Sequence, residues 1–212
     1  MNTPSRRAAV VAAVLVTATA PSASASPAGP LAEVPWPPPS TNGRFLPYPE
    51  NVDLSRTYPA CGSHIHVYPG DVFDLRYRAL VNDEGQTVVE YRGNLTVDVH
   101  RLSDGASLDE IGVSGTRFEI FEPDGQTVTY DHHGSAIVAA SDGVEAQVFT
   151  EAGLPEAFLY LSGDLTETVT YDSAPDELGQ QFPPALSAEI TENTTDYVFD
   201  LCDLLDEAPK DP

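Results

Sequence analysis

The sequence predicts an all-β fold, namely an antiparallel meander of long bent strands that forms a barrel or an orthogonal β-sandwich, with one C-terminal helix. Three observations lead to this prediction. Apolar and polar residues alternate over long segments, which is the period of a strand with one buried face. Turns with Asp104-Gly105 and Asp124-Gly125 separate such segments and are typical of hairpins. Only the apolar pattern at the end of the chain, over 198–205, is helical.

Five alternating segments are predicted as strands: 72–81, 86–101, 107–121, 127–140 and 157–171. The last four each have one interior glycine flanked by polar residues, and these are Gly93, Gly115, Gly134 and Gly163. Because glycine inside a strand commonly marks a bend or a bulge, we expect each of these strands to bend near its middle. After Val113 the apolar residues of the third segment move from odd to even positions, at Phe118 and Ile120, which predicts an inserted bulge residue. The segment 141–155 is predicted as a connection.

The end of the domain carries a helix signal. Thr195 is of a type that caps helix N-termini, and Asp196 would lie in the first turn, where a carboxylate is favourable. The apolar stripe at i, i+3, i+4 and i+7 consists of Val198, Leu201, Cys202 and Leu205. We expect this helix to cover an open end or side of the β-domain.

The first 25 residues have the three parts of a secretory signal peptide. A basic segment with Arg6 and Arg7 precedes an apolar run at 8–20, and Ala23-Ser24-Ala25 is an A-x-A cleavage site. The apolar run is too short to span a membrane. We therefore expect a secreted, extracellular protein, exported by the Sec or the twin-arginine route.

The domain organisation follows from composition. Residues 26–60 are rich in proline, serine and alanine and are predicted to be a disordered linker, because proline cannot donate the hydrogen bonds of a sheet. The alternative is that Trp36 and Tyr48 dock on the domain. The folded domain is expected over 61–207, with a polar tail at 208–212.

Cys61 and Cys202 are the only two cysteines of the chain. In an exported protein an even number of cysteines predicts disulfides, and two cysteines allow one intramolecular pairing. By the chain-entropy estimate, closing so long a loop stabilises the fold by about 4–5 kcal/mol. The bridge would join the first and last segments of the domain.

Charge restricts the partners of this protein. The chain has 33 acidic and 10 basic residues, a formal net charge of −23. Because such a surface repels phosphate backbones and anionic lipids, we expect no nucleic-acid partner, and we also expect no membrane span. Lys210 is the only lysine, which excludes Schiff-base chemistry within the domain. No motif predicts a cofactor, and a protein or small-molecule partner and the oligomeric state are left open.

Four segments resemble those of small secreted β-rich proteins predicted from high-GC Gram-positive bacteria: YRGNLTVDV, TVTYDHHG, GLPEAFLYLSGD and DYVFDLCDLL. The likeness covers roughly residues 61–205 and consists of strand, glycine and strand, followed by a terminal Asp-x-Cys helix. It implies export and the β architecture. It carries over no functional residues.

His64 and His66 are the candidate metal ligands. Residues i and i+2 of a strand face the same side, as two metal-ligating imidazoles must. A further ligand could come from Asp131, His132 or His133. The alternative is a pair of exposed or locally hydrogen-bonded histidines.

His132 and His133 face opposite sides if they lie on a strand, so at most one of them faces the interior. An inward histidine beside a carboxylate could act as a general base or a pH sensor, and the alternative is a histidine that only packs in the core or at its rim. The sequence contains neither G-x-S-x-G nor H-E-x-x-H, so the catalytic residues are left unknown.

Three functions are consistent with the sequence. The first is a non-enzymatic binding or structural role at the cell envelope. The second is a small apolar-ligand binder or a cyclase-like enzyme that uses a barrel cavity, and the third is a metal-binding protein through His64 and His66. Aromatic residues of the strands would fill the core or line such a cavity, and they are Tyr77, Tyr91, Phe118, Tyr130, Phe158 and Tyr160.

Overall fold

The computed structural model describes residues 37–48, 54–174 and 183–210; the predicted signal peptide lies outside them. Within these residues the fold is mostly β, with two short helices. The elements are β1 (Leu46–Pro47), β2 (Arg56–Tyr58), β3 (Ile65–Val81), β4 (Thr87–Arg101), β5 (Ser107–Phe121), β6 (Thr127–Gly134), β7 (Ala136–Ala139), α1 (Gly143–Glu151), β8 (Ala157–Tyr160), β9 (Asp164–Tyr171), β10 (Ala185–Asn193), β11 (Phe199–Asp200) and α2 (Leu201–Glu207).

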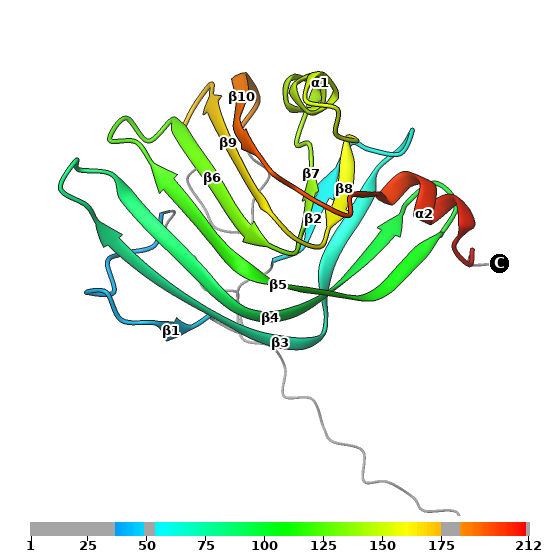
Figure 1. Ribbon diagram of the computed structural model, residues 1–212, viewed down its shortest axis with the longest axis horizontal. Coiled ribbons are helices and arrows are strands. Elements are labelled where there is room, and N and C mark those ends of the chain that lie inside the picture. Colours follow the sequence, from blue (N-terminus) through cyan, green and yellow to red (C-terminus); the bar gives the residue numbers. More distant parts are fainter. Residues whose placement is uncertain (1–36, 49–53, 175–182, 211–212) are drawn as a thin grey trace, which may run out of the picture.

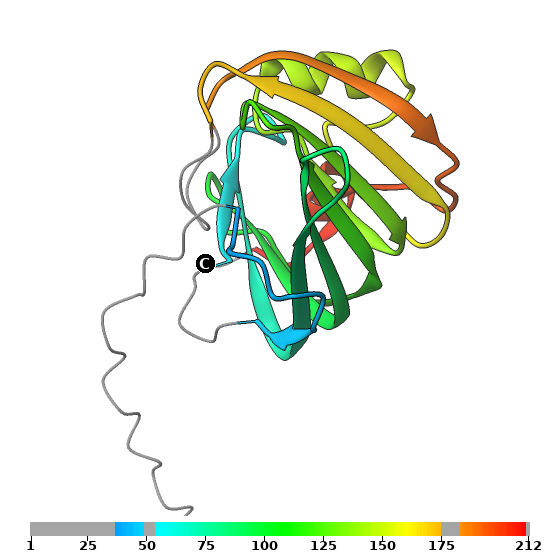
Figure 2. The same cartoon turned by 90° about the vertical axis from the view of Figure 1, so that its left-hand side faces the viewer.

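The main sheet is a strongly curved antiparallel meander (Figure 1). Its strand order is β1-β3-β4-β5-β6-β9-β10, and β2 also pairs with β3. A smaller sheet has the order β11-β8-β7. Figure 2 shows the main sheet curling round its concave side, with α1 beside β10. The predicted meander is thus confirmed, but in the described residues the sheet stays open, since no strand pairing joins β10 to β1, β2 or β3.

A row of glycines crosses the sheet where the strands bend. Gly93, Gly115 and Gly134 are cross-strand partners on β4, β5 and β6. The row continues to Gly163, whose carbonyl oxygen accepts a hydrogen bond of 3.0 Å from the Gly134 N–H. A Cβ atom at Gly115 would lie 2.4 Å from the carbonyl oxygen of His133, so a larger residue does not fit without movement of the backbone. The glycines that the sequence marks as bend sites therefore align across four segments of the chain.

Two of the predicted strands are divided at this row. The segment 127–140 forms β6 and β7, and the segment 157–171 forms β8 and β9. Gly134 and Gly163 have φ angles of 94° and 100°, so the backbone turns there. β7 and β8 consequently leave the main sheet and pair with each other.

Helix α1 occupies the segment that the sequence predicted as a connection. The carboxylate of Asp142 caps it by accepting hydrogen bonds from the N–H groups of Val144 (2.8 Å) and Glu145 (3.2 Å). The other oxygen of Asp142 accepts from Ala185 N–H at 2.7 Å, which ties the start of the helix to β10. The sequence pattern gave no signal for α1, because its buried residues are only Phe149 and the charged Glu145.

The C-terminal helix is present but begins later than predicted. Asp200, not Thr195, is its N-cap and accepts a hydrogen bond from Cys202 N–H at 2.8 Å. The prediction of the Thr195 cap was wrong, because Phe199 and Asp200 are extended and pair with β8. Leu201 and Leu205 are fully buried.

Part of the predicted linker lies on the sheet. β1 and β2 pair with β3, and Tyr48 is only 4% exposed. Trp36 and residues 49–53 lie outside the described residues. Two further differences concern strands, since β3 begins at Ile65 instead of Val72 and β10 was not predicted.

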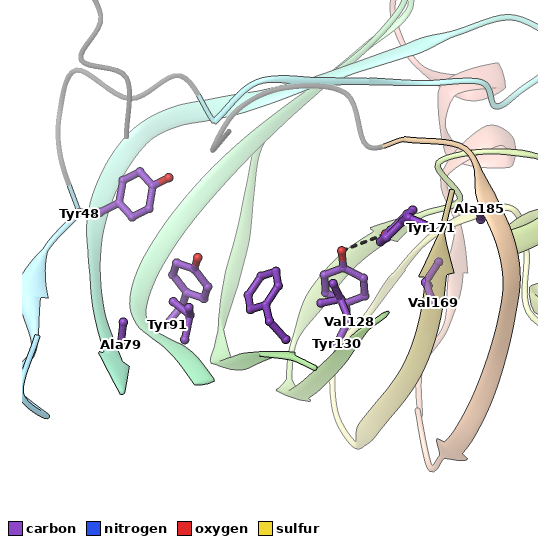
Figure 3. Packing of buried hydrophobic residues seen from close by; sticks show 10 residues of the cluster. Tyr48, Ala79, Tyr91, Val128, Tyr130, Val169, Tyr171 and Ala185 are labelled. Carbon is purple, nitrogen blue, oxygen red and sulfur yellow. Dashed lines mark hydrogen bonds between the residues drawn. The ribbon is translucent and has the colours of Figure 1, made fainter. Parts of the chain in front are cut away.

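The concave face of the main sheet carries a core cluster rich in tyrosine (Figure 3). The side chains of Tyr48, Tyr91 and Tyr130 point to the same side of the sheet, and Tyr130 and Tyr171 are joined by a hydrogen bond of 2.9 Å between their hydroxyl groups. A second cluster lies under α2 and contains Leu201. No helix of the described residues has the length and apolarity needed to cross a membrane.

The predicted disulfide between Cys61 and Cys202 is formed, with 5.0 Å between the two Cα atoms. It joins residues that are 141 positions apart and attaches α2 to the chain before β3. Arg101 provides a second attachment, because its guanidinium donates to Asp104 at 2.9 Å and to Asp206 of α2 at 2.6 Å.

Candidate functional site

A cavity of about 260 Å³ lies on the concave side of the sheet, over the glycine row. Gly93 and Gly115 form part of its wall. Most of the wall is apolar, and it includes Leu75, Leu95, Val97, Val113 and Ile137. Of the aromatic residues predicted to fill the core or line a cavity, Tyr91 lines this one, whereas Phe158 and Tyr160 pack in the core beside α1.

Two charged side chains of β5 lie in the cavity wall. Arg117 is the cross-strand partner of Tyr91, and Glu119 is the partner of Tyr130 on the other side. All four residues therefore belong to the concave face. Glu119 is 3% exposed, whereas the Arg117 side chain keeps 40% exposure and forms part of the cavity surface.

This orientation of β5 differs from the prediction that Phe118 and Ile120 turn inward after a bulge. The pairing with β4 is continuous from Ile111 to Phe121, so odd-numbered residues face the concave side of the sheet over this whole length. The irregularity of β5 comes earlier, where Glu110 has a φ of 55°. The prediction was wrong because it assigned the inward face to the apolar residues, and this strand places an ion pair there.

Both carboxylate oxygens of Glu119 have partners. Oε1 lies 2.7 Å from Nη2 of Arg117, and Oε2 accepts a hydrogen bond of 3.1 Å from the hydroxyl of Tyr91. Burial raises the pKa of Glu119, and the nearby charge of Arg117 and the hydrogen bond from Tyr91 offset part of that increase. The carboxyl group is therefore easier to protonate than an exposed glutamate.

Arg117 has few partners for a guanidinium, which has five N–H donors. Its carboxylate partner is Glu119, and its Cζ lies 5.1 Å from the centre of the Tyr130 ring. Its Nε is buried without a hydrogen-bond acceptor among the described residues.

His132 is the inward histidine of the pair, as the opposite-face prediction requires. It is 9% exposed and is the cross-strand partner of Arg117. Burial lowers its pKa well below the usual value, and the charge of Arg117 lowers it further. At neutral pH the imidazole is therefore uncharged, with one nitrogen able to donate and the other able to accept a hydrogen bond.

A second cavity of about 60 Å³ adjoins the first, since Arg117 and His132 line both. Two buried carboxyl groups lie in its wall. Glu145 accepts a hydrogen bond of 2.7 Å from Ser141 N–H, whereas Oε1 of Glu167 is buried without a partner among the described residues. Burial, together with the nearby Glu145, raises the pKa of Glu167 to about 8.

His133 lies on the opposite side of β6, between two carboxylates. Its Nδ1 is 2.7 Å from Asp164, and its Nε2 is 3.0 Å from Asp131. These hydrogen bonds raise its pKa, that to Asp164 most, although burial opposes the shift. Asp131 also accepts a hydrogen bond of 3.0 Å from the Thr166 hydroxyl. The hydrogen bonds among these four side chains link β6 to β9.

Neither of the two predicted metal ligands lines the cavity. His64 is exposed and precedes β3. His66 is half-buried, and its Nδ1 is 3.1 Å from the Thr57 hydroxyl of β2. No cluster of three or more His, Cys, Asp or Glu side chains suited to a metal occurs in residues 37–48, 54–174 and 183–210. The metal site at His64 and His66 stays a prediction.

Comparison with protein-family models, with curated proteins and with solved structures gave no match for this chain. The resemblance to secreted β-rich proteins of high-GC Gram-positive bacteria thus stays a prediction.

Proposed function

We propose that this protein is an exported small-molecule-binding protein that holds an apolar ligand in the 260 Å³ cavity. The proposal is based on one observation, namely that the cavity has a mostly apolar wall with a few converging polar side chains. Ligand sites in proteins commonly have this composition. The volume is slightly below the roughly 300 Å³ at which typical sites begin, so the ligand is smaller than a drug-sized molecule.

Export is part of the proposal. It is supported by the signal-peptide pattern of the first 25 residues and by the disulfide between Cys61 and Cys202, since disulfides persist in oxidising compartments. A ligand-binding role outside the cell is also one form of the envelope-associated, non-enzymatic role that the composition of the chain favours.

The test is binding of the neutral fluorescent probe N-phenyl-1-naphthylamine to the folded mature protein. Saturable binding of one probe per chain is expected. Leu95→Trp fills the cavity and should abolish it, whereas Asn94→Trp, on the neighbouring exposed position, should not. Absence of probe binding, or equal loss in both variants, would contradict the proposed site.

A second function uses the same cavity for proton transfer, as in a cyclase-like or isomerase reaction. The specific support is His132, an uncharged imidazole in the wall shared by both cavities, placed beside the cationic Arg117. Such a pair can remove a proton and stabilise the resulting oxyanion. Turnover of a carbonyl substrate that is lost in His132→Gln while probe binding remains would establish this function over simple binding.

A further inference from the structure

The cavity wall of this acidic protein contains arginine side chains. The chain has a formal net charge of −23 and only nine arginines. Two of them, Arg56 and Arg117, line the cavity, and Glu119 is the single acidic residue among the described residues of its wall. A fixed positive charge in a partly buried site attracts anions more strongly than the same charge in water.

The ion pair with Glu119 does not use the full binding capacity of Arg117. One ion-pair contact of 2.7 Å joins Nη2 to Glu119, and Nε has no acceptor in the described part of the chain. Glu119 in turn is held by Tyr91, which directs its second oxygen away from Arg117 toward the phenol. The remaining N–H groups of Arg117 can therefore be satisfied by an acceptor from a ligand.

His132 provides a second hydrogen-bonding group at the same place. Only 9% of His132 is exposed, and it lines the cavity. No hydrogen bond to its ring is found within the described residues. An uncharged imidazole can donate one N–H to an oxygen atom beside Arg117. Arg117 and His132 are direct cross-strand partners, so both can reach one two-oxygen group.

The apolar part of the wall lies next to this polar end. Leu95, Val97 and Val113 lie on β4 and β5, on the other side of Gly93 and Gly115 from Tyr91 and Arg117. An apolar chain or ring placed over the glycines would thus have its polar group at Arg117.

We propose that the ligand is a small monocarboxylate with an apolar body, whose carboxylate pairs with Arg117 and hydrogen-bonds to His132. This inference rests on the proposed ligand-binding function. It adds the chemical class of the ligand and the residues that select it.

The test compares three ligands that share one alkyl chain: decanoate, decan-1-ol and decylamine, each titrated calorimetrically into the mature protein at pH 7.5. Decanoate should bind at least about tenfold more tightly than decan-1-ol, because a charge-assisted hydrogen bond is stronger than a neutral one. Decylamine should bind most weakly. Equal affinity for acid and alcohol, or preference for the amine, overturns the carboxylate assignment while ligand binding itself stands. If none of the three binds, both proposals fail.

Amino-acid substitutions test whether Arg117 causes the preference for a carboxylate. Arg117→Gln/Glu119→Gln removes both charges of the pair together, so Glu119 is not left as an unpaired carboxylate, and it should lower decanoate affinity at least about tenfold with decan-1-ol nearly unchanged. Arg76→Gln, an exposed arginine on β3, is the matched control for loss of one positive charge and should change neither affinity by more than about twofold. Far-UV circular dichroism confirms that both variants fold. Unchanged decanoate binding in the double variant overturns the role of Arg117.

Discussion

Arg117 and Glu119, two residues apart on β5, form a 2.7 Å ion pair that faces the concave interior of the sheet. In a strand with a strict period of two, these positions belong to the same face as the buried Phe121. Burying a carboxylate requires both a charge partner and hydrogen bonds, and Arg117 and Tyr91 supply them. The following predictions test this pair and the architecture around it.

Replacing Tyr91 by phenylalanine removes the hydroxyl that donates to Glu119 at 3.1 Å. We expect the free energy of unfolding to fall by about 1–2 kcal/mol, since a buried acceptor loses its partner. Urea denaturation measures this change. Tyr77→Phe is the control, because Tyr77 is the cross-strand partner of Tyr91 and is only half-buried. Equal destabilisation by both substitutions would argue against the Tyr91–Glu119 bond.

The close approach of strands at the glycine row can be tested with two glycines of β5. Gly115→Ala should destabilise the protein by about 2 kcal/mol or more, because its Cβ would lie 2.4 Å from a backbone oxygen of the neighbouring strand. Gly112→Ala, also on β5, meets nothing within 4 Å and should be neutral or stabilising by up to about 1 kcal/mol. Thermal unfolding of the two variants gives the comparison. A harmless Gly115→Ala would mean that the strands are spaced differently at the bend.

The buried Glu167 should make stability depend on pH. Its pKa is raised from 4.5 in the unfolded chain to about 8 in the fold, chiefly by burial and secondly by Glu145, while Arg117 opposes the shift. Between these values the folded state binds more protons than the unfolded state, so stability falls as pH rises from about 4.5 to 8. Glu167→Gln should flatten this slope, as measured by urea denaturation across the range. A slope identical to that of the natural sequence would show that other groups cause it.

The disulfide should matter most for α2. Removing it with Cys61→Ser/Cys202→Ser should lower stability by about 2–5 kcal/mol and expose α2 to proteolysis. The far-UV β signal should persist, because β3 to β6, β9 and β10 pair with one another independently of the bridge. Limited proteolysis with mass spectrometry identifies the cut sites. Loss of the β signal would mean that the core depends on this link, and two reactive thiols in the native protein would contradict the bridge.

The local sequence pattern was sufficient to predict most strands of the main sheet. The alternating segment 86–101 corresponds closely to β4, and the Asp-Gly turns before β5 and β6 lie where predicted. These features depend on neighbours in sequence, which is why they can be read from it. The inward orientation of Arg117 and Glu119 could not be read in this way, because each is a polar residue whose burial is stabilised by partners on other strands.

The sequence by itself determined the antiparallel meander, the positions of its bends, the pairing of the two cysteines and the residues of the terminal apolar stripe. Each of these follows from periodicity, from a residue type with special geometry or from a count of two. Only the tertiary structure decided that Gly134 and Gly163 divide two strands between two sheets, and that four glycines align across the sheet, two of them in the cavity wall. It also placed Arg117 beside His132. These three outcomes depend on cross-strand register, which arises from contacts between residues far apart in the chain.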